Sequence, residues 1–291
     1  MPIKHNTLLA IRITSGINRL IYYTQKLPLV GRKIPDAVYS VPTWKRVFAI
    51  LALIANVILG VGNRFLYVGL MVWFPVMDMA SETWTDADRL TMFMHIFLLL
   101  SFVAAGVSYA IMLEPKQEKF VAVKLMRMLP DVYMRTALLY RYLTYFLFCI
   151  PALVVFLPRL QVPVWHALAL AAVLTLWRVL CEYGHLVLFR RTGKVLIRDN
   201  VIVWVTIGIC YAWAYAPLFL EGIPLLGGIL LQWPVLVLLA AAGLYAWVRL
   251  ARYDGYRAVV DAASRRDDPL LDFQQMMSDA QKTAVAVKER D

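Results

Sequence analysis

The sequence predicts an all-α membrane protein, a bundle of six transmembrane helices with both chain ends in the cytoplasm and an N-terminal helix at the membrane interface. Hydrophobic residues make up 61% of the 291 residues and charged residues only 17%, too apolar for a soluble domain of this length. A transmembrane helix needs about 20 mainly apolar residues. Long apolar runs occur near 47–77, 89–113, 137–157, 164–189, 200–219 and 225–249.

Positive charge is sorted to one side of these runs. Of the 30 Lys and Arg residues, 26 lie in four segments: 1–46, 114–141, 190–199 and 249–291. The loops on the other side hold Arg89 and Arg159, together with several acidic residues. Cytoplasmic loops retain Lys and Arg, so we expect these four segments to face the cytoplasm from a plasma membrane. The net charge of +11 is then explained by basic residues that lie beside anionic lipid headgroups on the cytoplasmic side. The sequence has no compact basic module of the kind that would indicate nucleic-acid binding.

The chain divides into three parts: a cytoplasmic elbow segment, 1–43, a six-span domain, 44–250, and a cytoplasmic tail, 251–291. Within 6–27, basic and apolar residues form opposite helical stripes, which predicts an amphipathic helix lying in the headgroup layer. A basic leader with no specific contact is the alternative. The tail is polar, and we expect it to be solvated, although a short helix from Pro269 would also fit the pattern.

The first apolar run is too long for one upright span. Gly60, Gly62, Asn63 and Arg64 interrupt it near the middle. Either the helix is strongly tilted, or it bends at the glycines. The sequence alone leaves both possibilities open.

Five polar residues lie inside the predicted spans: Asn63, Arg64, Arg178, Glu182 and His185. Charges in hydrocarbon are costly and usually face the bundle interior or a water-filled cavity. Arg178 and Glu182 are four residues apart, and this spacing predicts an ion pair on one face of the helix. His185 lies on the same face. This pair is either structural, with a bridge to Arg64 or to another subunit, or in contact with a transported substrate or proton.

The segment 114–141 is far longer than a connection between two spans requires. Pro130 and Asp131 divide it into a helix, a turn and a second helix that enters the third span. Apolar residues such as Leu129 alternate here with Lys124 and Arg127. We therefore expect the segment to rest on the membrane surface or on a cytoplasmic protein.

No catalytic residue, cofactor or metal site is predicted. The stretch RRTGKVL at 190–196 lacks the first glycine and the Ser or Thr of a Walker A motif, and HExxH and GxSxG are absent. The three cysteines lie in spans without metal-ligand spacing, and the chain has only four histidines. We therefore do not expect the chain to be an enzyme by itself.

Five features together resemble the membrane subunits of bacterial ABC exporters of the ABC-2 type. They are the interfacial segment, the six spans, the two cytoplasmic chain ends, the helical segment between spans two and three, and a bent element between spans five and six. In particular, EKFVAVKLMRMLPDVYMRTALLYRYL is similar to the coupling segment of such permeases. The resemblance implies contact with a nucleotide-binding subunit through residues in this segment, namely Lys124, Met126, Arg127, Leu129, Pro130 and Asp131.

The resemblance also implies a function. It suggests a permease subunit that works with a second permease subunit and a separate cytoplasmic ABC ATPase. An amphipathic, peptide-like or lipid-like substrate is expected, because few charges lie in the spans. Two alternatives remain open: a secondary transporter that uses Glu182 and His185, and a membrane scaffold or assembly protein that transports nothing.

Overall fold

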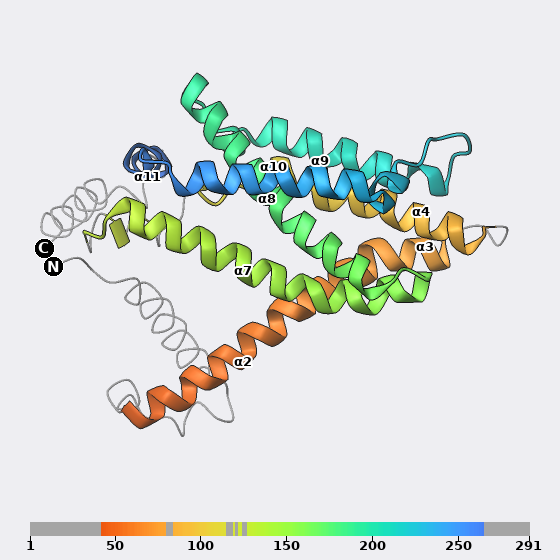
Figure 1. Cartoon of the computed structure of the whole chain (residues 1–291), viewed down its shortest axis with the longest axis horizontal. Coiled ribbons are helices and arrows are strands. Elements are labelled where there is room, and N and C mark those ends of the chain that lie inside the picture. Colours follow the sequence, from red (N-terminus) through yellow and green to blue (C-terminus); the bar gives the residue numbers. More distant parts are fainter. Residues whose placement is uncertain (1–41, 80–83, 115–118, 120–121, 124–126, 265–291) are drawn as a thin grey trace, which may run out of the picture.

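The computed structural model describes residues 42–79, 84–114, 119, 122–123 and 127–264 (Figure 1). Within this part of the chain the secondary structure is helical and contains no strand. The predicted interfacial helix at 6–27 and the possible helix from Pro269 lie outside the described residues. Six helical segments are long and apolar enough to cross a membrane: Val47–Asp78, Asp86–Ser108, Pro130–Leu160, Val164–Thr192, Asn200–Leu218 and Trp233–Ala251. The predicted six-span helical bundle is confirmed.

Several spans are built from more than one kind of helical turn. The first comprises α2 (Pro42–Leu66), the π-helical η3 (Tyr67–Trp73) and α3 (Phe74–Asp78), and the second comprises α4 (Asp86–Phe97), the π-helical η4 (Leu98–Ala104) and α5 (Ala105–Ser108). The other spans are α7 (Pro130–Phe156) with η6 (Leu157–Leu160), α8 (Val164–Thr192), α9 (Asn200–Tyr215) with η8 (Ala216–Leu218), and α10 (Trp233–Ala251). Short elements complete the fold: η7 (Leu196–Arg198), η9 (Gly227–Leu231) and α11 (Tyr256–Ser264).

Span one is not broken at its glycines. The α-helix α2 continues through Gly60 and Gly62 to Leu66, and the departure from α-geometry comes later, in η3. Gly60 has a packing role, because a Cβ atom there would lie 2.3 Å from the Phe148 ring. The glycine therefore lets α7 approach α2 closely without interrupting the helix.

Local sequence sets where the helices begin and end. Thr85 and Asp88 form a reciprocal capping box at the start of α4, with Thr85 N donating to Asp88 Oδ2 at 3.0 Å. Pro130 occupies the first turn of α7, where its missing N–H costs nothing, as the sequence predicts. Gly193 adopts φ 68° after α8 and donates its N–H to Phe189 O at 2.8 Å, a left-handed helix end that favours glycine.

The helices alternate in direction, so the connections fall at two ends of the bundle (Figure 1). We call the end that holds the connections 109–129 and 193–199 the inner end, since its charge predicts that it is cytoplasmic. The opposite end, with the connections 161–163 and 219–226, is the outer end.

The outer half of the bundle has an aromatic core. Rings from spans one to four pack in a chain of edge-to-face, tilted and stacked contacts, formed by Trp73, Phe93, Phe97, Phe102, Phe156 and Trp177. The bent element predicted after span five is η9, which packs directly against α4: a Cβ atom on Gly227 would lie 2.0 Å from Thr91 O. His95 fixes the same contact, because Nδ1 accepts a hydrogen bond from Leu226 N at 3.0 Å.

A second core lies at the inner end, where α11 packs on α7, and its buried residues Tyr256, Val259 and Val260 belong to one hydrophobic cluster with residues of α7, α8 and α10. Burial raises the pKa of Tyr256 to about 12, so its hydroxyl stays protonated. That hydroxyl donates to Leu250 O at 2.6 Å, at the C-terminal end of α10. The sequence reading did not predict α11, which lies in the segment expected to be a solvated tail.

The inner half of span one diverges from the rest of the bundle. This half exposes large apolar side chains, including Ile50, Leu53 and Ile58. In Figure 1, α2 diverges from α7 toward the inner end. Apolar exposure of this kind fits a lipid-facing surface.

Candidate functional site

Two arginines from different spans meet at one tyrosine ring near the middle of the bundle. The guanidinium carbon of Arg64, on α2, lies 4.4 Å from the centre of the Tyr145 ring, and that of Arg178, on α8, lies 4.1 Å from it. All three residues lie near the midpoints of the spans Val47–Asp78, Pro130–Leu160 and Val164–Thr192. Arg64 reaches Tyr145 because helical side chains lean toward the N-terminal end of their helix, here the inner end.

A cavity of about 360 Å³ lies beside these side chains. Arg141 is its third cation, and its guanidinium donates to the hydroxyl of Tyr109. Spans one, three and four and the segment that follows α5 all contribute to the lining. The lining residues are Arg64, Tyr109, Ile111, Arg141, Tyr142, Thr144, Tyr145, Phe148 and Arg178. We call this space the arginine cavity.

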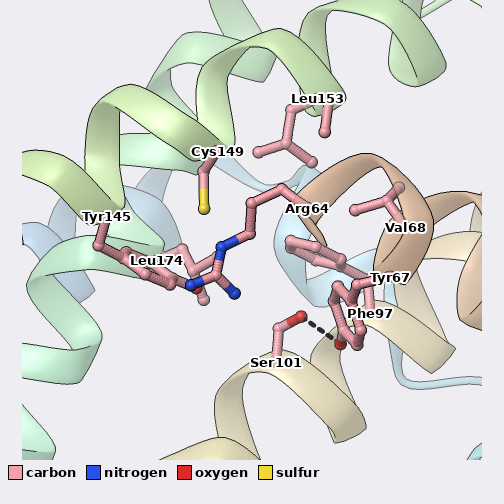
Figure 2. Close-up of a pocket in the computed structure, with 10 residues that line it drawn as sticks. Arg64, Tyr67, Val68, Phe97, Ser101, Tyr145, Cys149, Leu153 and Leu174 are labelled. Atoms are coloured by element: carbon pink, nitrogen blue, oxygen red, sulfur yellow. Dashed lines mark hydrogen bonds between the residues drawn. The ribbon is translucent and has the colours of Figure 1, made fainter. Parts of the chain in front are cut away.

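Toward the outer end, the space next to the arginine cavity is filled by buried side chains, among them Val68, Leu153 and Leu174. Arg64 and Tyr145 also border a pocket of only about 10 Å³, shown in Figure 2. On its far side, Tyr67 and Ser101 share a hydrogen bond of 2.7 Å that joins the π-helical turns η3 and η4 (Figure 2). Such turns often occur at functional sites, and here they carry Trp73 and Phe102 of the aromatic core.

The positive charge of the arginine cavity is not balanced by the described residues. In this part of the chain, no carboxylate lies within ion-pair distance of Arg64, Arg141 or Arg178, and Arg178 Nε is buried without a hydrogen-bond acceptor. An arginine at the centre of a membrane helix costs about 2.5–3.5 kcal/mol on insertion scales. A cation–π contact returns about 0.5–2 kcal/mol. The stacking on Tyr145 therefore offsets only part of the cost.

The predicted ion pair between Arg178 and Glu182 is wrong. The Glu182 carboxylate is buried and accepts hydrogen bonds from Ile111 N at 2.7 Å, Met112 N at 2.6 Å and the Tyr142 hydroxyl at 3.0 Å. Helical spacing brings Arg178 and Glu182 to one face of α8. The carboxylate, however, accepts hydrogen bonds from backbone amides that follow span two. Arg178 turns instead toward Tyr145.

Two other side chains of span four, His185 and Trp177, also bind the backbone of span two. His185 Nε2 donates to Gly106 O at 3.0 Å, and Trp177 Nε1 donates to Phe102 O at 2.8 Å. Lys119 Nζ adds hydrogen bonds to the carbonyls of Ile111, Met112 (3.1 Å) and Glu114 (2.5 Å). Glu182 and His185 therefore have a structural role here, holding the inner end of span two against span four.

The other predicted site residues lie away from the cavity. Asn63 is exposed on α2 and does not line the cavity. Lys124 and Met126 lie outside the described residues, so their expected role stays a prediction. Arg127 and Leu129 are exposed at the inner end, Arg127 with φ 52°, while Pro130 and Asp131 form the first turn of α7.

Sequence reasoning singled out Arg64 and Arg178 but missed Arg141, Tyr109 and Tyr145. Arg141 was counted among the cytoplasmic charges, although it lies inside the span Pro130–Leu160. The one available signal was the run YRYLTY at 140–145, which places an arginine among three tyrosines on one helix.

The fold and the cavity together define a polytopic helical membrane protein with a cationic, aromatic-lined cavity inside its bundle. The chain matches no protein-family model, and neither a curated protein nor a solved structure is similar to it.

Proposed function

We propose that this protein is the membrane subunit of a transporter that moves an amphipathic substrate through its helical bundle. The observation that carries the proposal is the arginine cavity, which combines charge and aromatic surface at mid-span depth. Binding sites of transporters commonly lie near the bilayer midplane. Buried side chains fill the space on the outer side of the arginine cavity, and this arrangement fits one state of an alternating-access cycle.

We further propose that transport is driven by a separate cytoplasmic ATPase of the ABC type, with a second permease subunit completing the assembly. This rests on the resemblance to ABC-2 permeases and on the exposed turn before α7. Leu129 is 61% exposed there, an apolar side chain at the charged inner end of the bundle. Apolar side chains that become buried when a partner docks supply much of the binding energy of protein interfaces.

Co-purification followed by reconstitution tests the proposal. The protein is isolated gently from its native membrane, any partner ATPase is identified, and both are placed in liposomes with a fluorescent alkyl phosphate as probe. We expect ATP-dependent movement of the probe that liposomes lacking this protein do not show. No movement beyond that of empty liposomes, with or without ATP, would contradict a transport function.

A pair of substitutions at the inner end tests the coupling. Leu129→Asp places a charge on the exposed turn, while Lys194→Asp changes an exposed residue of the other inner connection. We expect Leu129→Asp to abolish probe-stimulated ATP hydrolysis while the protein still folds, and Lys194→Asp to have little effect. Unchanged stimulation in Leu129→Asp would contradict ATPase docking at this turn.

The geometry favours this function over a proton-coupled secondary transporter that uses Glu182 and His185. A group that carries protons must exchange hydrogen-bond partners with water or substrate. Glu182 instead accepts from two backbone amides and Tyr142, and His185 binds the Gly106 carbonyl. These contacts support a structural role for both side chains.

A further inference from the structure

We infer that the arginine cavity binds the oxyanion headgroup of an amphiphile, a phosphate or carboxylate attached to an alkyl chain, with Arg64 and Arg178 as its principal ligands. This inference deepens the proposed function and rests on it for the role of the bound molecule. It names the class of substrate that the cavity selects.

The first argument is the number of free donors. A guanidinium carries five N–H donors and no acceptor. Within the described part of the chain, the guanidinium groups of Arg64 and Arg178 stack on aromatic rings, and neither donates a hydrogen bond to a protein group. An oxyanion offers the paired acceptors that match this fork.

The second argument is the position of the two charges. The guanidinium carbons of Arg64 and Arg178 lie 4.4 Å and 4.1 Å from the centre of the Tyr145 ring, so both positive charges stand against one ring at the border of the same cavity. Figure 2 shows the Arg64 guanidinium between Tyr145 and the pair Tyr67 and Ser101. Arg141, toward the inner end, adds a third positive charge to the same cavity.

The third argument concerns the nearest acid. Glu182 lies one helical turn from Arg178 and would be its natural counterion. Its carboxylate is instead used by the amides of Ile111 and Met112 and by Tyr142. The acidic side chain closest in sequence is thus committed to the fold, and the cavity keeps its positive charge for a ligand.

The fourth argument favours an amphiphile over a free ion. Aromatic and apolar groups, including Ile111, Tyr142 and Phe148, share the lining with the arginines. Val57 and Leu53 lie on the same side of α2 as Gly60 and Arg64, about one and two turns from Gly60 toward the inner end, and both are exposed. An alkyl chain can therefore continue from the cavity along α2.

Binding to the full-length protein in phosphatidylcholine nanodiscs, measured by calorimetry, tests the inference. The probes are dodecyl phosphate, its neutral dimethyl ester and inorganic phosphate. We expect dodecyl phosphate to bind at least about tenfold more tightly than the ester, and inorganic phosphate at equal concentration to compete weakly. Equal affinity for dodecyl phosphate and the ester would overturn the inference, and full competition by inorganic phosphate would overturn the amphiphile assignment.

Matched variants test whether the probe binds in the arginine cavity. Arg64→Gln and Arg178→Gln should each remove the preference for dodecyl phosphate, whereas Arg190→Gln, an exposed arginine outside the cavity, should keep it. If a glutamine variant fails to fold, Arg64→Lys and Arg178→Lys keep the charge without the planar fork and should bind with intermediate affinity. An equal loss in Arg190→Gln would overturn the assignment.

The inference and the proposed function can fail separately. Selective binding of dodecyl phosphate by a protein that moves no probe would contradict transport and leave the anion site standing. Transport of the dimethyl ester as fast as dodecyl phosphate, without selective binding, would overturn the anion site and leave transport standing.

Discussion

The Glu182 carboxylate accepts a hydrogen bond from the backbone N–H of Met112 at 2.6 Å, and this contact joins span four to the end of span two. Ile111 N and the Tyr142 hydroxyl bind the same carboxylate. One buried side chain thus accepts hydrogen bonds from the backbone N–H groups of Ile111 and Met112, which follow the end of α5 at Ser108. An unsatisfied buried donor costs about 1–3 kcal/mol, so the fold depends on this residue.

We predict that Glu182→Ala lowers the free energy of unfolding by about 3 kcal/mol or more, because it leaves the amides of Ile111 and Met112 without their acceptor and removes the nearer acceptor of the Tyr142 hydroxyl. Glu182→Gln keeps one acceptor oxygen and should lose less. The midpoint of thermal unfolding in detergent measures both variants. Wild-type stability in Glu182→Ala would mean that the carboxylate does not hold the two spans together.

Arg178 and Glu182 should act independently, since the structure gives them different partners. The losses of stability in Arg178→Ala and Glu182→Ala are expected to add in the double variant, within about 0.5 kcal/mol. A double-mutant cycle on the same unfolding measurement checks this. A double variant much milder than the sum would restore the ion pair suggested by their spacing.

The contact between η9 and α4 offers a matched pair of glycines. Gly227→Ala would bring a Cβ atom to 2.0 Å from Thr91 O and 2.4 Å from His95 N, whereas a Cβ atom on Gly228 meets nothing within 4 Å. Overpacking typically costs about 1–3 kcal/mol. We expect Gly227→Ala to lower the unfolding midpoint and Gly228→Ala to leave it nearly unchanged. Equal midpoints in the two variants would contradict the close packing of η9.

The orientation of the bundle is testable with single cysteines on a background lacking Cys149, Cys181 and Cys210. Gln161 and Glu221 are exposed at the outer end, and Lys194 is exposed at the inner end. We expect an impermeant thiol reagent to label Gln161→Cys and Glu221→Cys in whole cells, and Lys194→Cys only after lysis. Labelling of Lys194→Cys in intact cells would invert the orientation that the charge bias predicts.

Much of the fold could be predicted because it depends on local pattern. The lengths of the apolar runs fix the six spans, and Pro130 fixes the start of α7. The helix α11 was missed because it has only nine residues and because its apolar side chains, Tyr256, Val259 and Val260, pack on spans that are distant in the sequence.

The site was harder to predict, since its residues come from three spans. Arg64 and Arg178 stand out as charges in apolar runs, but nothing in their spacing shows that they share Tyr145. Helical periodicity suggested Glu182 as the partner of Arg178. The competing donors, the amides of Ile111 and Met112, become available only once span two ends beside span four.

The central claim is that the arginine cavity lies on the route of the transported molecule. The most direct measurement is the rate at which a fluorescent alkyl phosphate crosses the membrane of proteoliposomes that contain this protein and its co-purified ATPase. We predict that Arg64→Gln and Arg178→Gln each lower this rate at least about tenfold, while Arg190→Gln retains it. Wild-type rates in both cavity variants, with the proteins folded and the ATPase bound, would contradict the account.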